Sequence, residues 1–189
     1  MEAARKEKKH YTYADYCTWE DGRRWELIDG AAYAMSPGAS FGHQSISGEI
    51  FRQLSNFLKG KSCKAFIAPF DVRLNANGAD DTVVQPDVLV VCDRSKLESG
   101  KGVIGAPDFI VEILSPSSLR HDMIIKKRLY LQSGVREYWI VDPDHKMITK
   151  HILHDAGYVS HTFDEHDETV SVETLDGCNI NIADVFEEL

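Results

Sequence analysis

Two carboxylates stand in apolar stretches of the sequence where residues of a buried core would be expected. Asp87 follows Pro86 and precedes the run Val88 to Val91, and Glu112 lies inside the run from Phe109 to Leu114. If the two runs pair in a buried sheet, the acids face each other in a medium of low dielectric constant. Like charges there repel and lose hydration, so protonation, a basic partner or a metal cation must compensate them. The pair therefore predicts a metal-dependent active site.

The ligands that this pair offers suit a hard cation. Mg²⁺ prefers carboxylate and carbonyl oxygens, and we expect Asp87 and Glu112 to bind it together with the backbone carbonyl of Ile113. Mn²⁺ is the alternative ion, and no small-molecule cofactor is expected. A metal ion in such a site polarises a phosphate group and lowers the pKa of a bound water. The chemistry indicated is the hydrolysis of phosphodiester bonds.

A lysine beside the acids would stabilise the negative charge that develops during hydrolysis. The position two after Glu112, where a lysine would share its strand face, holds Leu114 instead. In the segment that follows, Lys126 stands four residues before Tyr130 and shares its face of a helix, whereas Lys127 is rotated away. We therefore expect Lys126 to supply the catalytic cation.

Glu26 and His43 are further candidates for the same site. Glu26 is embedded in an apolar run of the first expected hairpin and could bind the metal ion, and His43 begins a long helix, where it could bind an anion or carry a proton. Each also has an ordinary explanation, as an exposed hairpin acid or a helix-start histidine, and Lys126 could be a solvated lysine paired with Asp122. The other histidines, among them His151, share no ligand spacing and are expected on exposed hairpins.

The expected elements describe a mixed α/β fold. The dipeptide Asp-Gly at 29–30 predicts a β-hairpin, apolar residues at helical spacing predict an amphipathic helix, and short β-type runs near the end predict an antiparallel extension. On the helix over 119–133 we expect Ile124, with Ile125, Leu129 and Tyr130, to form the apolar face. The expected strands cover 25–28, 31–35, 64–74, 88–91, 109–114, 137–141, 147–153, 158–163 and 169–175, and the expected helices cover 12–19, 42–58, 119–133 and 183–189.

Composition and charge are those of a globular protein. The 189 residues, 43% of them hydrophobic, suffice for one domain with a real core, which we expect over 11–189 after a flexible leader at 1–10. A net charge of −9 disfavours non-specific binding of nucleic acid but permits a local basic groove. No apolar run is long enough to cross a membrane. Four widely spaced cysteines argue against a zinc site or a disulfide framework and favour the cytoplasm.

Several motifs occur together in one order: WELIDG, GHQ, VVQPDVLVV, APDFIVEILSPSS, D-x-x-x-K-x-x-x-Y and GVREYWIVDP. Over 11–189 the chain resembles the Uma-two family of restriction endonucleases, in the PD-(D/E)XK nuclease-like superfamily. The resemblance implies a restriction-endonuclease-like core, a central mixed β-sheet flanked by helices, with Mg²⁺ at the acids. It assigns Asp87 to the PD motif, Glu112 to the second acid and Glu26 to the acid of the N-terminal element. The signature lysine is replaced by Leu114, and a lysine from the following helix agrees with Lys126.

The leading hypothesis is a metal-dependent endonuclease that hydrolyses DNA and acts as a homodimer, because two sites are needed to cut both strands. Because Leu114 replaces the signature lysine, one alternative is a catalytically weak or inactive protein of the same fold that has a nucleic-acid-binding or regulatory function. A second alternative is a protein-interaction module in which Tyr138, Trp139 and the C-terminal hairpins form an interface.

Overall fold

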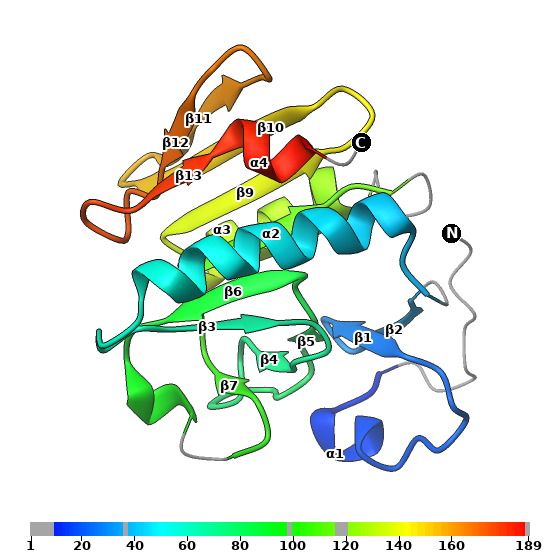
Figure 1. The fold of residues 1–189 in the computed structure, drawn as a ribbon. Coiled ribbons are helices and arrows are strands. Elements are labelled where there is room, and N and C mark those ends of the chain that lie inside the picture. The colour runs from blue at the N-terminus through cyan, green and yellow to red at the C-terminus, as the bar shows by residue number, and fades with distance from the viewer. Residues whose placement is uncertain (1–9, 36–37, 98–99, 116–120, 188–189) are drawn as a thin grey trace.

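The computed structural model describes residues 10–35, 38–97, 100–115 and 121–187. Outside these ranges lie most of the expected leader, the first two residues of the helix expected over 119–133 and the last two of that expected over 183–189. Within them there are two sheets and a small β-ribbon; helix α2 (Phe41–Phe57) lies in front of the central sheet in Figure 1, with α3 (Lys127–Ser133) behind that sheet. The fold is the mixed α/β arrangement that the sequence predicts.

Six strands form the central sheet, and the two strands that carry the predicted acids are neighbours in it. In spatial order the strands are β11 (Gly157–Phe163), β10 (Met147–His154), β9 (Glu137–Asp142), β8 (Phe109–Ile113), β6 (Val88–Val91) and β3 (Lys64–Ile67). Strands β8 and β9 run parallel and the other neighbours antiparallel, so the sheet is mixed. Val88 pairs with Val111, and the same register continued by one residue brings Asp87 opposite Glu112.

Each face of the central sheet is covered by a core of its own. On one face Ile46, Ile50 and Leu54 of α2 are fully buried against Val111 and its neighbours, and burying one such side chain contributes about 1.5–3 kcal/mol. On the other face Tyr130 of α3 packs with side chains that alternate with the first set along β6 and β8. Burial on both faces explains why these strands lack polar alternation.

The second sheet packs against the core that contains Tyr130, called here the second core, and Glu26 lies at its edge. Its strands, in spatial order, are β2 (Ala31–Ala34), β1 (Trp25–Ile28), β5 (Val83–Val84), β4 (Val72–Arg73) and β7 (Val103–Ile104). The hairpin β1–β2 turns through Asp29 and Gly30, both with positive φ, which is the conformation that an Asp-Gly turn favours. Because β1 pairs with β5 on the side opposite β2, Glu26 lies next to the segment that leads into β6.

The structure corrects three details of the expected elements. The strand expected over 64–74 is divided between the two sheets as β3 and β4, because the chain leaves the central sheet at Ala68-Pro69 and proline has no N–H with which to continue a ladder. Ile124 is 60% exposed rather than part of an apolar face. Strands β5, β7 and β13 (Asn179–Asn181) were not expected, and the strand expected over 169–175 is limited to β12 (Thr169–Ser171), which pairs with β13.

Four short helices complete the described part of the chain. They are α1 (Tyr13–Tyr16), the 3-10 helix η1 (Arg94–Leu97), the π-helix η2 (His121–Lys126) and α4 (Ile182–Phe186). Helix η2 continues directly into α3, which ends at Gly134 in a left-handed conformation. Within the described ranges, no helix is long and apolar enough to cross a membrane.

One pair of cysteines departs from the expectation of reduced, unpaired thiols. Cys63 and Cys92 form a disulfide with an S–S distance of 2.09 Å. Lys64 pairs with Val91 in the antiparallel ladder of β3 and β6, so the two cysteines that flank this pair face each other. This proximity follows from strand register, which the spacing of cysteines in the sequence does not reveal. The cysteines therefore no longer support the expectation of a reducing compartment.

Tyr138 and Trp139 are fully buried in the central sheet. They are core residues, as a compact apolar strand predicts, and they have no surface to offer a partner. The interaction module in which these two aromatic residues form an interface is therefore inconsistent with the fold.

Candidate active site

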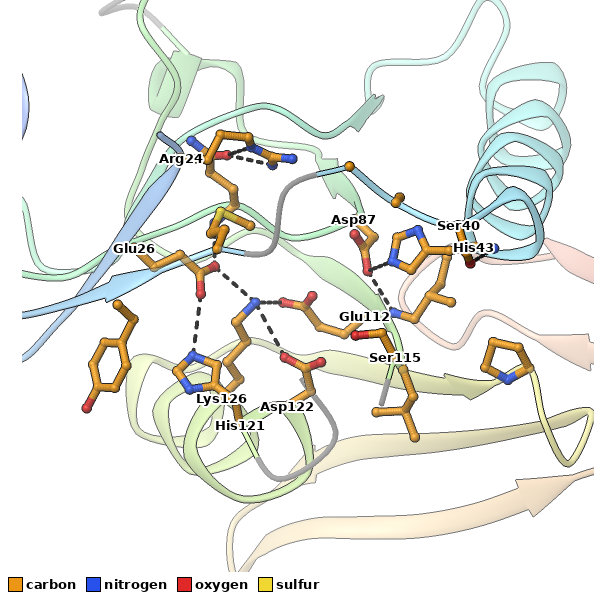
Figure 2. A pocket seen from close by; sticks show the side chains of 18 of the residues that line it. Arg24, Glu26, Ser40, His43, Asp87, Glu112, Ser115, His121, Asp122 and Lys126 are labelled. Carbon is orange, nitrogen blue, oxygen red and sulfur yellow. Dashed lines mark hydrogen bonds and ion pairs between the residues drawn. The ribbon is translucent and has the colours of Figure 1, made fainter. Parts of the chain in front are cut away.

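A pocket of about 350 Å³ lies where the two sheets, the beginning of α2 and helix η2 meet (Figure 2). Its lining contains every residue that the sequence predicts for the site: Glu26, His43, Asp87, Glu112, Ile113 and Lys126. These residues come from β1, α2, the entrance to β6, β8 and η2. The fold thus brings five separate segments of the chain to one cavity.

Asp87 is held from two sides. Its Oδ2 accepts a hydrogen bond of 2.8 Å from the backbone N–H of Ile113 and lies 3.3 Å from Nε2 of His43. Ser40, the N-cap of α2, accepts a hydrogen bond from the backbone N–H of His43 and so fixes the start of the helix at the pocket. Burial lowers the pKa of His43, but the hydrogen bond to Asp87 and its charge outweigh burial and raise the pKa.

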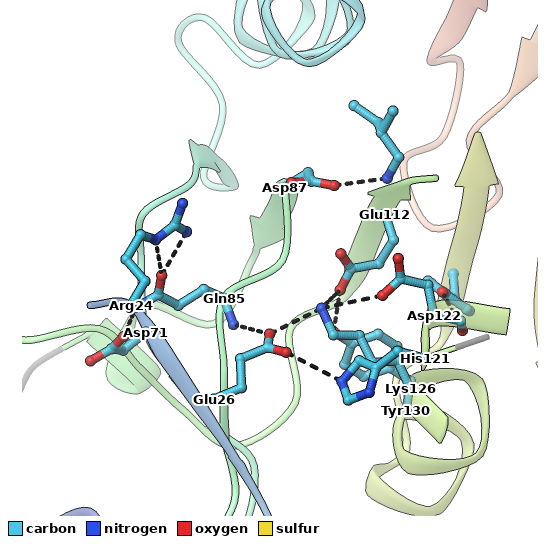
Figure 3. A network of polar contacts seen from close by, with 12 residues as sticks. Arg24, Glu26, Asp71, Gln85, Asp87, Glu112, His121, Asp122, Lys126 and Tyr130 are labelled. Atoms are coloured by element: carbon cyan, nitrogen blue, oxygen red, sulfur yellow. Dashed lines mark hydrogen bonds and ion pairs between the residues drawn. The ribbon is translucent and has the colours of Figure 1, made fainter. Parts of the chain in front are cut away.

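Glu112 is buried beside two donors from the helix that follows its strand (Figure 3). Its Oε1 accepts hydrogen bonds of 2.9 Å from Nζ of Lys126 and 2.6 Å from the hydroxyl of Tyr130. Burial raises the pKa of Glu112 well above its usual range, and the charges of Asp122 and Asp87 add to this rise while Lys126 opposes it. The carboxyl group therefore depends on nearby cations to ionise.

The ammonium group of Lys126 is shared by three carboxylates. Its Nζ lies 2.9 Å from Glu112, 3.0 Å from Glu26 and 3.6 Å from Asp122. Burial would lower the pKa of Lys126, but the three carboxylates, Glu112 first, outweigh it and hold the pKa well above its usual range. Lys126 is thus protonated at neutral pH. Lys127 does not line this pocket and contributes instead to a separate cavity.

Glu26 uses both of its oxygens. Oε1 accepts a hydrogen bond of 3.0 Å from the backbone N–H of Gln85 and contacts Lys126, and Oε2 lies 3.4 Å from Nε2 of His121. Burial raises the pKa of Glu26, but Lys126, His121 and Gln85 outweigh it, so the pKa is lowered and the side chain is ionised. With both oxygens engaged, Glu26 fixes Lys126 from the second sheet.

Sequence reasoning did not assign Arg24, Gln85, His121 or Asp122 to the site, yet all four line the pocket. Asp122 could have been assigned from the sequence, because it stands four residues before Lys126 and so shares its helix face. His121 packs against the ring of Tyr33, with ring centroids 5.0 Å apart, and no pattern in the sequence indicates that contact. Arg24 and Gln85 belong to β-type segments in which a polar residue alone is not informative.

Leu114 is buried in the second core, at 7% exposure. It shares the strand face of Glu112, as expected for residues two apart in a strand. The ammonium group that reaches Glu112 comes from η2 instead.

The pocket concentrates negative charge. Three carboxylates, those of Glu26, Glu112 and Asp122, share Lys126, and Asp87 lies in the same pocket against His43. Partly buried charges of one sign require protons or a cation. The described hydrogen bonds and ion pairs use only Oδ2 of Asp87 and Oε1 of Glu112. One oxygen of each carboxylate is thus not engaged by the described residues.

The pocket offers oxygen donors of the kind that a magnesium ion prefers. Across the described ranges, no group of three or more His, Cys, Asp or Glu side chains is arranged to hold a metal ion. Mg²⁺ is commonly bound by one or two carboxylates and retains several waters. Asp87, Glu112 and the carbonyl of Ile113 are a donor set of that kind.

Comparisons with known proteins agree with this architecture. The model of the Uma2 family, described as "Putative restriction endonuclease", matches residues 12–183. The "Uncharacterized protein slr1290" of Synechocystis sp. (strain ATCC 27184 / PCC 6803 / Kazusa) is 32% identical over 146 residues, which cover 76% of this chain and 74% of that protein.

A solved structure shares the fold. It is a crystal structure described as that of a putative nuclease belonging to DUF820 from Anabaena variabilis ATCC 29413, with a TM-score of 0.75 and 23% sequence identity over 93% of this chain and 97% of that one. The family match covers most of the sequence and includes every predicted site residue. The chain belongs to the Uma2 family.

Proposed function

We propose that this protein is a metal-dependent endonuclease that hydrolyses phosphodiester bonds in DNA. The observation that carries the proposal is the meeting of Asp87, Glu112 and Lys126, from three different elements, in one pocket. A pair of acids and a lysine at such a place has no structural purpose that an apolar core would not serve at lower cost. Membership in a family described as "Putative restriction endonuclease" supports the same function.

Asp87, Glu112 and the carbonyl of Ile113 would hold Mg²⁺, with Mn²⁺ as the alternative. The ion, when bound, supplies polarisation of the phosphate group and a water of lowered pKa. His43 holds Asp87 by its Nε2, and the backbone N–H of Ile113 fixes the same carboxylate oxygen. These two contacts orient the Asp87 carboxylate.

Lys126 would stabilise the negative charge that develops on the phosphate during hydrolysis. Its proton is secured by the three carboxylates around it, which raise its pKa. Glu26 and Asp122 contact Lys126, so we assign them as positioning residues. Both oxygens of Glu26 are engaged by protein groups, so we assign it to Lys126 and not, as the sequence had suggested, to the metal ion. This arrangement supplies a lysine to the site although Leu114 takes the place of the usual one.

The test is cleavage of supercoiled plasmid DNA by the purified protein with Mg²⁺ or Mn²⁺. We expect Asp87→Asn and Glu112→Gln to lower the rate by at least about 100-fold, because each removes an anionic metal ligand. Asp108→Asn is the matched control: Asp108 also follows a proline, but it caps the N–H of Cys92 and pairs with Arg136, away from the pocket. Absence of cleavage by the unmodified protein with either ion, or equal losses in all three variants, would contradict the proposal.

One observation favours a second candidate, a protein of the same fold that binds nucleic acid without cutting it. Lys126 is engaged by three carboxylates, and a lysine so engaged is less available to a phosphate. In that case Asp87→Asn and Glu112→Gln would leave DNA affinity intact while no ion supports cleavage.

We also propose a homodimer as the acting form, because one pocket per chain cuts one strand of a duplex. Sedimentation equilibrium with and without duplex DNA measures this directly. A monomer under both conditions that nevertheless cuts both strands at one position would contradict it.

A further inference from the structure

Arg24 lines the pocket beside the acids and is held there by a neutral group. Its Nε and Nη2 donate hydrogen bonds of 2.9 and 2.7 Å to Oε1 of Gln85, at the upper edge of the pocket in Figure 2. A guanidinium group carries five N–H donors, and the described contacts use two of them. Among the described residues Arg24 forms no ion pair. Its side chain thus keeps its full charge and three donors.

The amide of Gln85 can adopt one orientation only. Its Nε2 donates to Oδ1 of Asp71 at 2.8 Å and to the hydroxyl of Tyr16 at 3.1 Å. A carboxylate only accepts and a guanidinium only donates, so the nitrogen must face Asp71 and the oxygen must face Arg24. Because Gln85 is buried and every hydrogen-bonding position of its amide is occupied, its carbonyl fixes the plane of the guanidinium group.

The acceptor that orients Arg24 is neutral. A hydrogen bond from a guanidinium group is charge-assisted even when its acceptor carries no charge, so the amide of Gln85 orients Arg24 and leaves its charge in place. A glutamate at position 85 would neutralise Arg24 and could not donate to Asp71. The neutral acceptor therefore points to an anionic ligand as the partner of Arg24.

The position of Arg24 relative to the acids is set by the same segment. The backbone N–H of Gln85 donates to Glu26, and Gln85 stands two residues before Asp87 (Figure 3). The other basic groups of the pocket, on His43, His121 and Lys126, each lie within 4 Å of a carboxylate. Among the described lining residues, Arg24 is the basic one without such a partner.

We propose that Arg24 binds a phosphate of the nucleic-acid backbone adjacent to the phosphate that is hydrolysed. This inference rests on the proposed function and adds to it a subsite and the ligand class, a phosphodiester in a polymer. The planar fork of arginine matches two oxygens of a phosphate, and a backbone contact of this kind fixes register without reading sequence. Because the neighbouring phosphate does not react, the contact is equally strong before and during hydrolysis. Arg24 thus contributes to binding more than to the chemical step.

The test compares Arg24→Gln with Arg23→Gln. Arg23 is an exposed arginine one residue away that does not line the pocket, so its replacement removes the same charge without touching the subsite. Binding of a fluorescein-labelled DNA duplex is measured by anisotropy with Ca²⁺ in place of Mg²⁺, over a series of salt concentrations.

We expect Arg24→Gln to raise the Kd about tenfold or more, the loss expected for charge-assisted hydrogen bonds to a phosphate. The slope of log Kd against log salt should fall by about one. Arg23→Gln should change the Kd by less than about twofold, and Arg24→Lys, which keeps the charge without the fork, should lie between the two. In cleavage assays with Mg²⁺, Arg24→Gln should raise KM more than it lowers kcat.

The outcomes separate this inference from the function on which it rests. If the unmodified protein cleaves DNA while Kd and KM are unchanged in Arg24→Gln, or change equally in Arg23→Gln, the subsite is wrong and the nuclease stands. A fall in kcat at constant KM would equally overturn a binding role for Arg24. If the unmodified protein neither binds nor cuts DNA, the proposed function fails and the subsite fails with it. Circular dichroism of each variant verifies that it is folded.

Discussion

The charge balance of the pocket depends on single residues, and above all on Lys126. One ammonium group holds Glu26, Glu112 and Asp122 within 4 Å, and these acids in turn keep it protonated. The cost of removing one member of a buried ion pair exceeds the net contribution of the pair, because the remaining charge is left without a partner. Stability and activity are thus expected to depend on the same side chain.

We expect Lys126→Met to lower the free energy of unfolding by about 3–5 kcal/mol, since it leaves buried carboxylates unpaired. It should also abolish cleavage. Lys127→Met, the neighbouring substitution outside the pocket, should change stability by about 0.5 kcal/mol or less and leave cleavage intact. Urea unfolding at neutral pH measures both variants. A larger effect of Lys127→Met would show that the helix presents the other lysine to the site.

His151 gives a pH dependence that is separate from the pocket. Sequence reasoning expected it on an exposed hairpin, but it is buried on β10, and burial first, then the charge of Lys127, lowers its pKa from 6.5 to about 4. A histidine with a lowered pKa binds its proton more weakly in the folded than in the unfolded protein. Its contribution to stability is therefore complete above pH 6.5 and is lost as the pH falls toward 4.

The expected result is that His151→Gln flattens the loss of unfolding free energy between pH 6.5 and 4. His154→Gln, an exposed histidine on the same strand, should leave the slope of the unmodified protein unchanged. Urea unfolding at several pH values gives the three slopes. Identical slopes for His151→Gln and the unmodified protein would contradict the assignment.

At the scale of elements, helix η2 after β8 has a charged face, with Asp122 and Lys126, and an apolar face, with Ile124, and only one of them can be buried. Residues two apart in a helix point to nearly opposite sides, so Ile124 cannot be buried when Asp122 and Lys126 both point inward. The structure buries the charged face and leaves Ile124 exposed. The ion pairs with Glu112 and Glu26 explain this choice, because they come from two sheets and only the inward face can reach both.

A matched pair of substitutions tests this account of burial. Ile50→Ala on α2 removes a fully buried side chain and should lower the free energy of unfolding by about 2–5 kcal/mol. Ile124→Ala removes the same atoms from an exposed position and should cost about 0.5 kcal/mol or less. Urea unfolding measures the free energy of unfolding of both variants. A comparable loss of this free energy in Ile124→Ala would show that Ile124 is buried in a core.

The strands and the acids could be predicted, because their signals are local. A carboxylate inside an apolar strand is visible in a short window, and so is the four-residue spacing of Lys126 and Tyr130. Contacts between sheets could not be predicted. Arg24 meets Gln85 across 61 positions of sequence. Glu26 was expected at the site as a metal ligand, but its ion pair with Lys126 follows from the packing of β1 against the second core. Such contacts follow from the packing of whole elements, which no spacing encodes.

For the whole molecule, the net charge of −9 and the acidic pocket both favour stabilisation of the folded state by a bound cation. A protein with excess negative charge gains stability from a cation that binds the folded state only. Magnesium should therefore stabilise the folded protein as well as support its activity.

We expect saturating Mg²⁺ to raise the Tm of the unmodified protein, by roughly 2–4 °C for each kcal/mol of binding free energy. EDTA should reverse the rise. Asp87→Asn combined with Glu112→Gln should abolish it, and Asp108→Asn should retain it, because Asp108 lies outside the pocket. A rise of equal size in the double variant would locate the ion elsewhere.

Crystals soaked in Mn²⁺ and measured at the manganese absorption edge test the metal site most directly. Anomalous scattering locates the ion independently of activity and of stability. The predicted result is a peak within direct ligand distance of Asp87 and Glu112 that is absent from Asp87→Asn. A peak elsewhere in the molecule, with density around these two acids unchanged, would contradict the account.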